Sequence, residues 1–487
     1  MMAATSRGLV IMHRFARCFA RLVLVSLFSV TSSCSSEPQM PLPPIVGPVA
    51  PPPPPPPGPP LNADIVVAIN ANERFQTIDG FGVSMRLFSD PHLIFLPTLP
   101  GNSLQIPAAA QAQILDSLYV GIGLTRVRIG NDTRGIEPVN DNADPEVTDL
   151  SKFNFAGRNN DEFFSAVAGI RSRGATMWWA SPGQIELWMN KGNPEEYVEW
   201  AMAMLRRWRS QGMELPYYSI LNEPSYSYSG GAWGGVYIRD AVKLLGRKLK
   251  AEGFATKLVI PDDLTPAQSV EITRIVLADS EARGYVGAIA FHIYGSLADA
   301  SELKALSKQY SIPLWMTEWF IPKGMEWAEM VHTLISEYDV AAIDYLFGFY
   351  GLPSDAQLIS ILHSGVNYQG FRMEEHFHAF GNYAKYVRPG AVRVGVAAVR
   401  EDIKVTAFTR NGQLTIVAIN SGYSASTTVR FDIAGLASNR AFASVRTILE
   451  SGVNDRLKPQ PPIALSGSSI AAVLPPRSVS TLYQSPP

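Results

Sequence analysis

The sequence predicts an α/β protein, a (β/α)8 TIM barrel with a C-terminal side β-sandwich. Apolar runs of strand length alternate with helical patterns of period 3.6 through the middle of the chain. After Pro389 and Gly390 the helical pattern stops, and short β-rich runs separated by Gly, Asn and Ser follow. A doubly wound open sheet would show the same alternation, but it usually carries a Gly-rich phosphate loop after an early strand, and we find none. The barrel is therefore preferred.

Residues 1–34 are predicted to be an export signal of the lipoprotein type. Three arginines precede an apolar run at 22–30, which is shorter than the roughly 20 residues needed to span a bilayer. The following Thr-Ser-Ser-Cys at 31–34 resembles a bacterial lipoprotein signal, in which the cysteine, here Cys34, is lipidated. An ordinary cleaved signal with an incidental cysteine is the alternative. Cys18 and Cys34 are the only cysteines, so the exported body would have no disulfide.

Residues 35–61 are dominated by proline, with an unbroken run at 51–57. Such a segment adopts an extended polyproline helix and cannot form a packed core. We interpret it as a linker that holds the body away from a membrane surface. Residues 62–74 follow, and they contain a short strand at 65–69 that has no helix of its own. This strand is expected to join the side β-sandwich.

Residues 75–389 are expected to form the catalytic barrel. Several of its helices begin at a proline preceded by a capping residue, as at Asn193-Pro194 and Thr265-Pro266. The strands are predicted at 77–83, 124–129, 175–180, 217–221, 257–260, 288–294, 314–319 and 342–349, and the helices at 108–119, 161–173, 194–210, 236–251, 266–278, 298–308, 325–337 and 374–387. Residues 390–487 are expected to form the side β-sandwich, with strands at 392–399, 404–409, 414–420, 427–433, 444–449 and 479–483.

The formal net charge is only −2 at pH 7, so no global field draws the protein to nucleic acid or to an anionic membrane. We expect a neutral partner, an oligo- or polysaccharide substrate, and a monomeric protein that contacts a membrane only through its N-terminal lipid anchor. No nucleic acid, metal or other cofactor is expected.

Two predicted strands end on glutamates. Residues 217–224 read Tyr-Tyr-Ser-Ile-Leu-Asn-Glu-Pro, and proline cannot donate to a sheet ladder, so Asn222 and Glu223 are left at the strand tip. Glu318 lies near the end of the strand at 314–319. In a closed barrel these tips converge on one pocket. Retaining glycoside hydrolases use two carboxyl groups about 5 to 5.5 Å apart. Alternatively, Glu223 could cap the next helix, and Glu318 could pair with Arg126 or Arg128.

The order of the strand-tip motifs resembles glycoside hydrolase family 30, within the broader clan of (β/α)8 retaining glycosidases. The motifs are Asp-Gly-Phe-Gly-Val-Ser at 79–84, Gly-Leu-Thr-Arg-Val-Arg at 123–128, Trp-Ala-Ser-Pro at 179–182 with Trp-Met at 188–189, Leu-Asn-Glu-Pro at 221–224, His-Ile-Tyr-Gly at 292–295, Trp-Met-Thr-Glu at 315–318 and Tyr-Val-Arg-Pro-Gly at 386–390. The resemblance implies a barrel fused to a side β-sandwich that also recruits the N-terminal strand.

The resemblance also implies roles for individual residues. Glu223 would be the acid/base, Glu318 the nucleophile, and Asn222 would hydrogen-bond the sugar 2-hydroxyl. Arg128 would orient the nucleophile, unless it is a structural ion pair. His292 and Tyr294 would line the pocket. The candidates for stacking on sugar rings are Trp179, Trp188, Trp233 and Trp319, of which about half are expected to be ordinary packing.

Three departures from the family pattern bear on specificity. Val83 stands where the family usually has Gly, and Ala-Ser-Pro-Gly-Gln at 180–184 replaces the usual Trp-Ser-Pro-Pro. The arginine with which the family's glucuronoxylanases hold the glucuronate branch has no counterpart near the eighth strand before Arg372, which disfavours a uronate-dependent xylanase.

The sequence thus predicts a retaining β-glycoside hydrolase acting on neutral xylan- or glucan-type glycans. One alternative is a non-catalytic glycan-binding lipoprotein on the same fold. A second, a metal-dependent barrel hydrolase, needs clustered His and Asp ligands, whereas His292 is the only histidine at a predicted strand tip.

Overall fold

The structure is a computed structural model, and it describes residues 62–90, 93, 104–131, 135–156, 161–189, 194–226, 233–321, 323–351, 356–397, 400–436, 440–450, 453 and 455–484. The predicted export signal, the proline-rich linker and Cys34 lie outside the described residues. Among the described residues, no helix has both the length and the apolar character that crossing a membrane requires.

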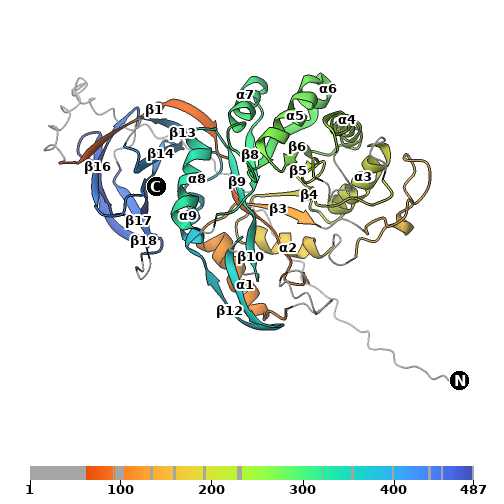
Figure 1. The fold of residues 1–487 in the computed structure, drawn as a ribbon, viewed down its shortest axis with the longest axis horizontal. Coiled ribbons are helices and arrows are strands. Elements are labelled where there is room, and N and C mark those ends of the chain that lie inside the picture. Colours follow the sequence, from red (N-terminus) through yellow and green to blue (C-terminus); the bar gives the residue numbers. More distant parts are fainter. Residues whose placement is uncertain are drawn as a thin grey trace, which may run out of the picture. The chain divides into compact units, whose positions relative to one another are not determined.

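The predicted barrel is confirmed. Its strands pair in sequence order, and the last pairs in parallel with the first, so that the sheet is closed (Figure 1). The barrel strands are β2 (Gly80–Ser84), β3 (Arg126–Asn131), β4 (Met177–Pro182), β5 (Tyr217–Ser219), β6 (Lys257–Asp263), β7 (Val286–His292), β8 (Leu314–Glu318) and β9 (Ala342–Tyr345).

Helices follow the strands as predicted. They are α1 (Ala108–Asp116), α2 (Asp161–Arg171), α3 (Pro194–Ser210), α4 (Gly235–Ala251), α5 (Pro266–Ala278), α7 (Ala300–Tyr310), α8 (Gly324–Ser336) and α9 (Glu375–Ala384). The Thr265 side chain accepts a hydrogen bond from the backbone N–H of Gln268, which caps α5 as its sequence indicated. A short helix, α6 (Ser280–Tyr285), was not predicted. Its N-cap is Asp279, whose side chain accepts from two backbone N–H groups.

The prediction of one strand at 342–349 is wrong. The chain leaves the barrel after β9, and β10 (Phe347–Tyr350) pairs instead with β11 (Gln357–Ser364), which pairs with β12 (Asn367–Met373). An apolar run of eight residues does not reveal where a chain exchanges one sheet for another, because both sheets bury it.

The C-terminal region forms one curled sheet of nine strands, in the order β18-β17-β20-β15-β14-β13-β1-β16-β19. The N-terminal strand β1 (Ile65–Thr77) lies between β13 and β16, which confirms the predicted recruitment. The terminal strands β18 and β19 contact each other, so the sheet folds over its own core like a sandwich. The C-terminal strands are β13 (Val392–Val396), β14 (Ile403–Arg410), β15 (Gln413–Asn420), β16 (Thr427–Ala434), β17 (Phe442–Ile448), β18 (Lys458–Ile463), β19 (Ser469–Leu474) and β20 (Ser478–Tyr483).

Strands β18 and β19 were not predicted. β18 carries Pro459, Pro461 and Pro462, which argue against a strand in the middle of a sheet, but β18 is an edge strand, where proline is tolerated.

Helices α8 and α9 join the two regions. α8 contacts β14, and α9 contacts β17 and β20, while both helices also contribute to the barrel core. A smaller apolar cluster fills the barrel interior and includes Trp179 and Trp315. The barrel is therefore closed at its centre, and its chemistry must lie at the carboxyl ends of the strands.

Candidate active site

The tip of β5 holds Glu223 in an unusual backbone conformation. Glu223 has φ of 50°, in the left-handed region that residues other than glycine rarely adopt. Its backbone N–H donates to the carbonyl of Asp262 at 2.9 Å, and the N–H of Asn222 donates to the carbonyl of Pro182 at 2.9 Å. Neighbouring strands thus fix the turn, and backbone strain of this kind, about 1 to 3 kcal/mol, is typical of functional sites.

Glu318 ends β8 on the other side of the pocket. The structure brings the two glutamates together, since carboxylate oxygens of Glu223 and Glu318 and a ring nitrogen of His292 all lie within 4.8 Å of one another. Glu223 is buried and Glu318 is partly exposed. A ligand entering from the carboxyl end of the barrel can therefore reach this pair.

Both carboxylate oxygens of Glu318 are held. Arg128 Nη1 donates to Oε2 at 2.8 Å, and the hydroxyl of Tyr294 donates to Oε1 at 2.9 Å. Burial, followed by the charge of Glu318, raises the pKa of Tyr294, so its hydroxyl stays protonated and remains a donor. These two bonds fix the direction in which Glu318 points.

Glu223 is held by His292. Nδ1 of His292 lies 2.9 Å from Glu223 Oε1, and Nε2 lies 3.2 Å from Asp262 Oδ1. Burial alone would lower the pKa of His292, but the carboxylates of Glu318, Asp262 and Glu223 outweigh burial and raise the pKa to about 10. The imidazole is therefore positively charged at neutral pH, and each of its nitrogens donates to a carboxyl oxygen.

Asp262 joins the two halves of the site, and the sequence reasoning missed it. Its side chain is fully buried, and its carboxylate accepts from Arg128 Nη2 at 3.0 Å, from Ser181 Oγ at 2.5 Å and from Thr317 Oγ1 at 2.6 Å. Burial would raise the pKa of Asp262, but Arg128 and then His292 hold it well below its usual range. Asp262 thus links the arginine on Glu318 to the histidine on Glu223.

Asn222 also lies in this network. Its Oδ1 accepts from Arg128 Nη2, and the residue is buried. Arg128 Nη1 also donates to Ser84 Oγ at 3.2 Å. The guanidinium of Arg128 therefore orients Asn222, Glu318 and Asp262 together.

The four predicted tryptophans separate into two groups. Trp179 is fully buried in the barrel interior against Trp315, and Trp233 is buried with its ring edge-on to Tyr237, at 4.1 Å between centroids. In this structure neither ring has a face on which a sugar could stack. Trp188 and Trp319 are partly exposed, and Trp188 Nε1 donates to the Glu137 carbonyl at 2.7 Å.

The spacing of Glu223, His292 and Glu318 would in principle suit a cation. However, the atoms that would bind the cation already have partners, since His292 Nδ1 lies 2.9 Å from Glu223 Oε1 and both carboxylate oxygens of Glu318 accept hydrogen bonds. The guanidinium of Arg128 adds a second positive charge 2.8 Å from Glu318. The charges of the described residues therefore favour a polar ligand over a divalent cation.

Comparisons with known proteins agree with this geometry, although no family model matches the chain. An endo-1,6-β-D-glucanase of Neurospora crassa is 23% identical over 363 residues, covering 66% of this chain and 72% of that protein. A putative glucosylceramidase 4 of Caenorhabditis elegans is 23% identical over 415 residues, covering 73% of this chain and 76% of that protein.

Among solved structures, a family 30 endoxylanase from Clostridium papyrosolvens is similar with a TM-score of 0.65 and 20% identity, covering 86% of this chain and all of that chain (100%). These named relatives are glycosidases, which supports the prediction of a glycosidase. The comparisons thus confirm the resemblance of this chain to glycoside hydrolase family 30 that its strand-tip motifs indicated.

Proposed function

We propose that this chain is a retaining β-glycoside hydrolase that works by double displacement, with Glu318 as nucleophile and Glu223 as acid/base. The observation that carries the proposal is the spacing of the pair, whose nearest carboxylate oxygens lie within 4.8 Å. Retaining enzymes need carboxyl groups about 5 to 5.5 Å apart, whereas inverting enzymes leave about 6.5 to 9.5 Å for a water molecule.

In the first step, a carboxylate oxygen of Glu318 forms a bond to the anomeric carbon while the bond to the leaving oxygen breaks. Glu223 gives its proton to that oxygen. The contacts of Arg128 and Tyr294 with Glu318, at 2.8 and 2.9 Å, hold the nucleophile in place, so little orientational freedom is lost at the moment of attack. Asn222 lies beside Glu223 to bind the sugar 2-hydroxyl.

In the second step, Glu223 takes a proton from water, the water oxygen bonds to the anomeric carbon, and Glu318 leaves. His292 holds Oε1 of Glu223 at 2.9 Å, which directs proton transfer to Oε2. The charged imidazole also compensates the negative charge that Glu223 acquires once it has given up its proton.

The proposed substrate is a neutral β-linked glycan of the xylan or glucan type. The small net charge of −2 supports a neutral partner, and the named relatives include a 1,6-β-glucanase and an endoxylanase. We further propose that the chain is exported and tethered as a monomer through a lipid on Cys34. Replacing Cys34 by Ala should move the protein from the membrane fraction to the soluble fraction, and unchanged membrane association would contradict the lipid anchor.

The acid/base role is tested by Glu223→Ala. The variant should lose turnover of aryl β-glycosides with poor leaving groups by about 10³-fold, because nothing protonates the leaving oxygen. Azide should restore turnover of activated glycosides and give a β-glycosyl azide, which NMR identifies. Glu302→Ala, on the surface of α7, is the matched control and should behave as the wild type. Failure of azide to react would argue against this role for Glu223.

A further inference from the structure

A groove runs along the junction of α8 with the nine-stranded sheet, away from the pocket described above. It consists of two hollows of about 380 and 540 Å³ that share Arg400, Glu401 and Lys404 as lining residues. Both volumes fall in the range of ligand sites, about 300 to 1,000 Å³. The groove is therefore large enough to hold sugar units.

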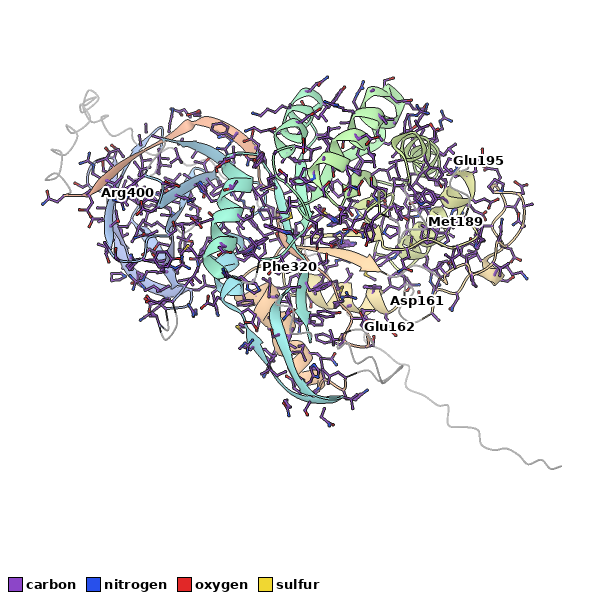
Figure 2. All side chains as sticks on the ribbon, in the orientation of Figure 1. Asp161, Glu162, Met189, Glu195, Phe320 and Arg400 are labelled. Atoms are coloured by element: carbon purple, nitrogen blue, oxygen red, sulfur yellow. The ribbon has the colours of Figure 1, made fainter. Side chains whose placement is uncertain are left out.

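The groove is separate from the catalytic glutamates. Figure 2 shows Arg400, in the loop before β14 of the nine-stranded sheet, well apart from Phe320, which lies two residues beyond Glu318. Lys404 on β14 reaches across to α8, where its Nζ donates to Glu329 Oε1 at 2.9 Å. A ligand here would contact the barrel's outer helix and the sheet, and would leave the active site open.

Each hollow has an exposed aromatic ring. Phe75 on β1 lines the first hollow and is 38% exposed, and Tyr423 lines the second and is 82% exposed. Each ring has an arginine over it, Arg393 at 3.8 Å from the Phe75 centroid and Arg477 at 4.7 Å from the Tyr423 centroid. These contacts hold the rings in place while they remain exposed, which reduces the entropy that a stacking ligand must overcome.

The charges in the groove are paired. Arg393 donates to Asp339 at 2.6 Å, Arg400 Nη2 donates to Asp402 at 2.8 Å, and Lys404 is bound to Glu329. Because each cation already has a carboxylate partner, the groove offers no unopposed positive field for phosphate or nucleic acid. It offers both hydrogen-bond donors and acceptors, which is what a ligand rich in hydroxyl groups requires.

His332, on α8, adds a buried polar group to the first hollow. Among the described residues its Nδ1 has no hydrogen-bond partner. Burial, reinforced by the charge of Lys404, lowers the pKa of His332 to about 4, so the ring is neutral at pH 7. The neutral ring therefore adds no charge to the lining of this hollow.

We propose that this groove is a second glycan-binding site, which holds a neutral β-linked chain between Phe75 and Tyr423 while the barrel acts on another part of the polymer. The choice of glycan rests on the proposed function. The two rings would stack on sugar faces, and the paired charged side chains would bind hydroxyl groups. Tethering one chain at two places raises the effective concentration of substrate at the active site.

The test is native affinity electrophoresis in gels containing xylan or β-1,6-glucan, with Glu223→Gln/Glu318→Gln as the background so that the glycan is not consumed. Tyr423→Ala and Phe75→Ala should each weaken retention about fivefold. Tyr423→Phe keeps the ring and should be retained like the background protein. Val66→Ala, on β1 but outside the groove, is the control for an exposed apolar side chain.

A second measurement uses the active enzyme. Tyr423→Ala should lower kcat/KM on the polymer by about fivefold and leave kcat/KM on an aryl β-glycoside unchanged, because the small substrate does not reach the groove. Since Tyr423 is mostly exposed, its replacement should leave the thermal unfolding midpoint unchanged.

Equal retention of the ring variants and the background protein would contradict a second glycan-binding site in the groove. The absence of any retention would contradict it as well. A different outcome is that retention depends on Tyr423 and Phe75 but the active enzyme cleaves no glycan. This outcome would support the second glycan-binding site and contradict the proposed function. If the active enzyme cleaves the glycan but retention does not depend on the two rings, the result would support the proposed function and contradict the second glycan-binding site.

Discussion

Arg126 and Arg128 are two residues apart on β3, but they lie at different depths in the barrel and have different roles. Arg126 and Asp344 are both fully buried, and they form a bidentate pair at 2.8 and 3.0 Å that Trp315 covers at 4.2 Å from its ring centroid. Arg128 lies one layer nearer the carboxyl ends of the strands. It divides its donors among Glu318, Asp262, Asn222 and two serines.

The difference lies in the partners. Asp344 is sealed in the barrel, whereas the Glu318 side chain keeps 14% of its surface accessible. The sequence allowed either arginine to pair with Glu318, and the structure assigns that contact to Arg128. The sealed Arg126–Asp344 pair can contribute only to folding, whereas the network of Arg128 includes an accessible carboxylate and can act on a ligand. Matched substitutions of the two arginines should separate these effects.

The largest expected effect is that of Arg128→Lys on activity. Lysine keeps the positive charge opposite Asp262 but cannot reproduce the guanidinium fork. We expect kcat/KM on an aryl β-glycoside to fall about 10³-fold, or ~4 kcal/mol of transition-state stabilisation, measured by initial rates. A loss smaller than tenfold would show that Arg128 is only a structural ion pair.

Arg126→Met should affect stability instead. It leaves the carboxyl of Asp344 buried without its counter-ion, and breaking such a pair lowers the free energy of unfolding by about 3 kcal/mol. Urea denaturation measures this change, while kcat/KM of the folded variant should stay within about threefold of the wild type. Arg126→Met/Asp344→Leu should recover most of the loss. If the Arg126→Met protein were fully folded but inactive, the purely structural role of Arg126 would be contradicted.

His292 should make the stability of the site depend on pH. Its pKa is raised to about 10 in the folded protein against about 6.5 when unfolded. Its contribution is therefore fully present below pH 6.5 and is lost as the pH rises from 6.5 through 10. His292→Gln should lower the free energy of unfolding at pH 6.5 by about 2 kcal/mol, and the difference from the wild type should shrink towards pH 10. A difference that is constant across this range would contradict a charged imidazole.

The smallest expected effect is that of Tyr294→Phe. It removes one hydrogen bond to Glu318 and leaves the contact with Arg128, so kcat should fall about fivefold with little change in unfolding free energy. The control is Tyr226→Phe, whose hydroxyl belongs to an exposed residue on the loop after β5. Equal effects of the two substitutions would mean that Tyr294 does not position Glu318.

Much of the site was predictable because it lies at strand tips. Asn222-Glu223-Pro224 and Glu318 interrupt apolar runs, and the closure of the barrel brings such interruptions together whatever the loops do. Asp262 was not predicted as a site residue because the predicted strand stopped at residue 260, whereas β6 continues to Asp263. The Asp-Asp pair after Ile-Pro lies within β6 and is an acidic strand tip like the others.

The tryptophans illustrate the limit of sequence reasoning. Trp178 and Trp179 are neighbours on β4, so their side chains point to opposite faces of the sheet. Which of them enters the barrel depends on register, which the sequence does not reveal. The exchange of sheets between β9 and β10, and the edge position of β18, likewise depend on contacts between residues far apart in the chain.

The most direct test of the account is covalent labelling of Glu318. Incubation with a 2-deoxy-2-fluoro-β-glycosyl fluoride should inactivate the enzyme and leave one glycosyl unit attached, and peptide mass spectrometry should place it on Glu318. The 2-fluorine slows both displacement steps, but the anomeric fluoride is a good leaving group, so the intermediate forms faster than water releases it. Attachment to a different residue, or hydrolysis with inversion at the anomeric carbon and no adduct, would contradict the account.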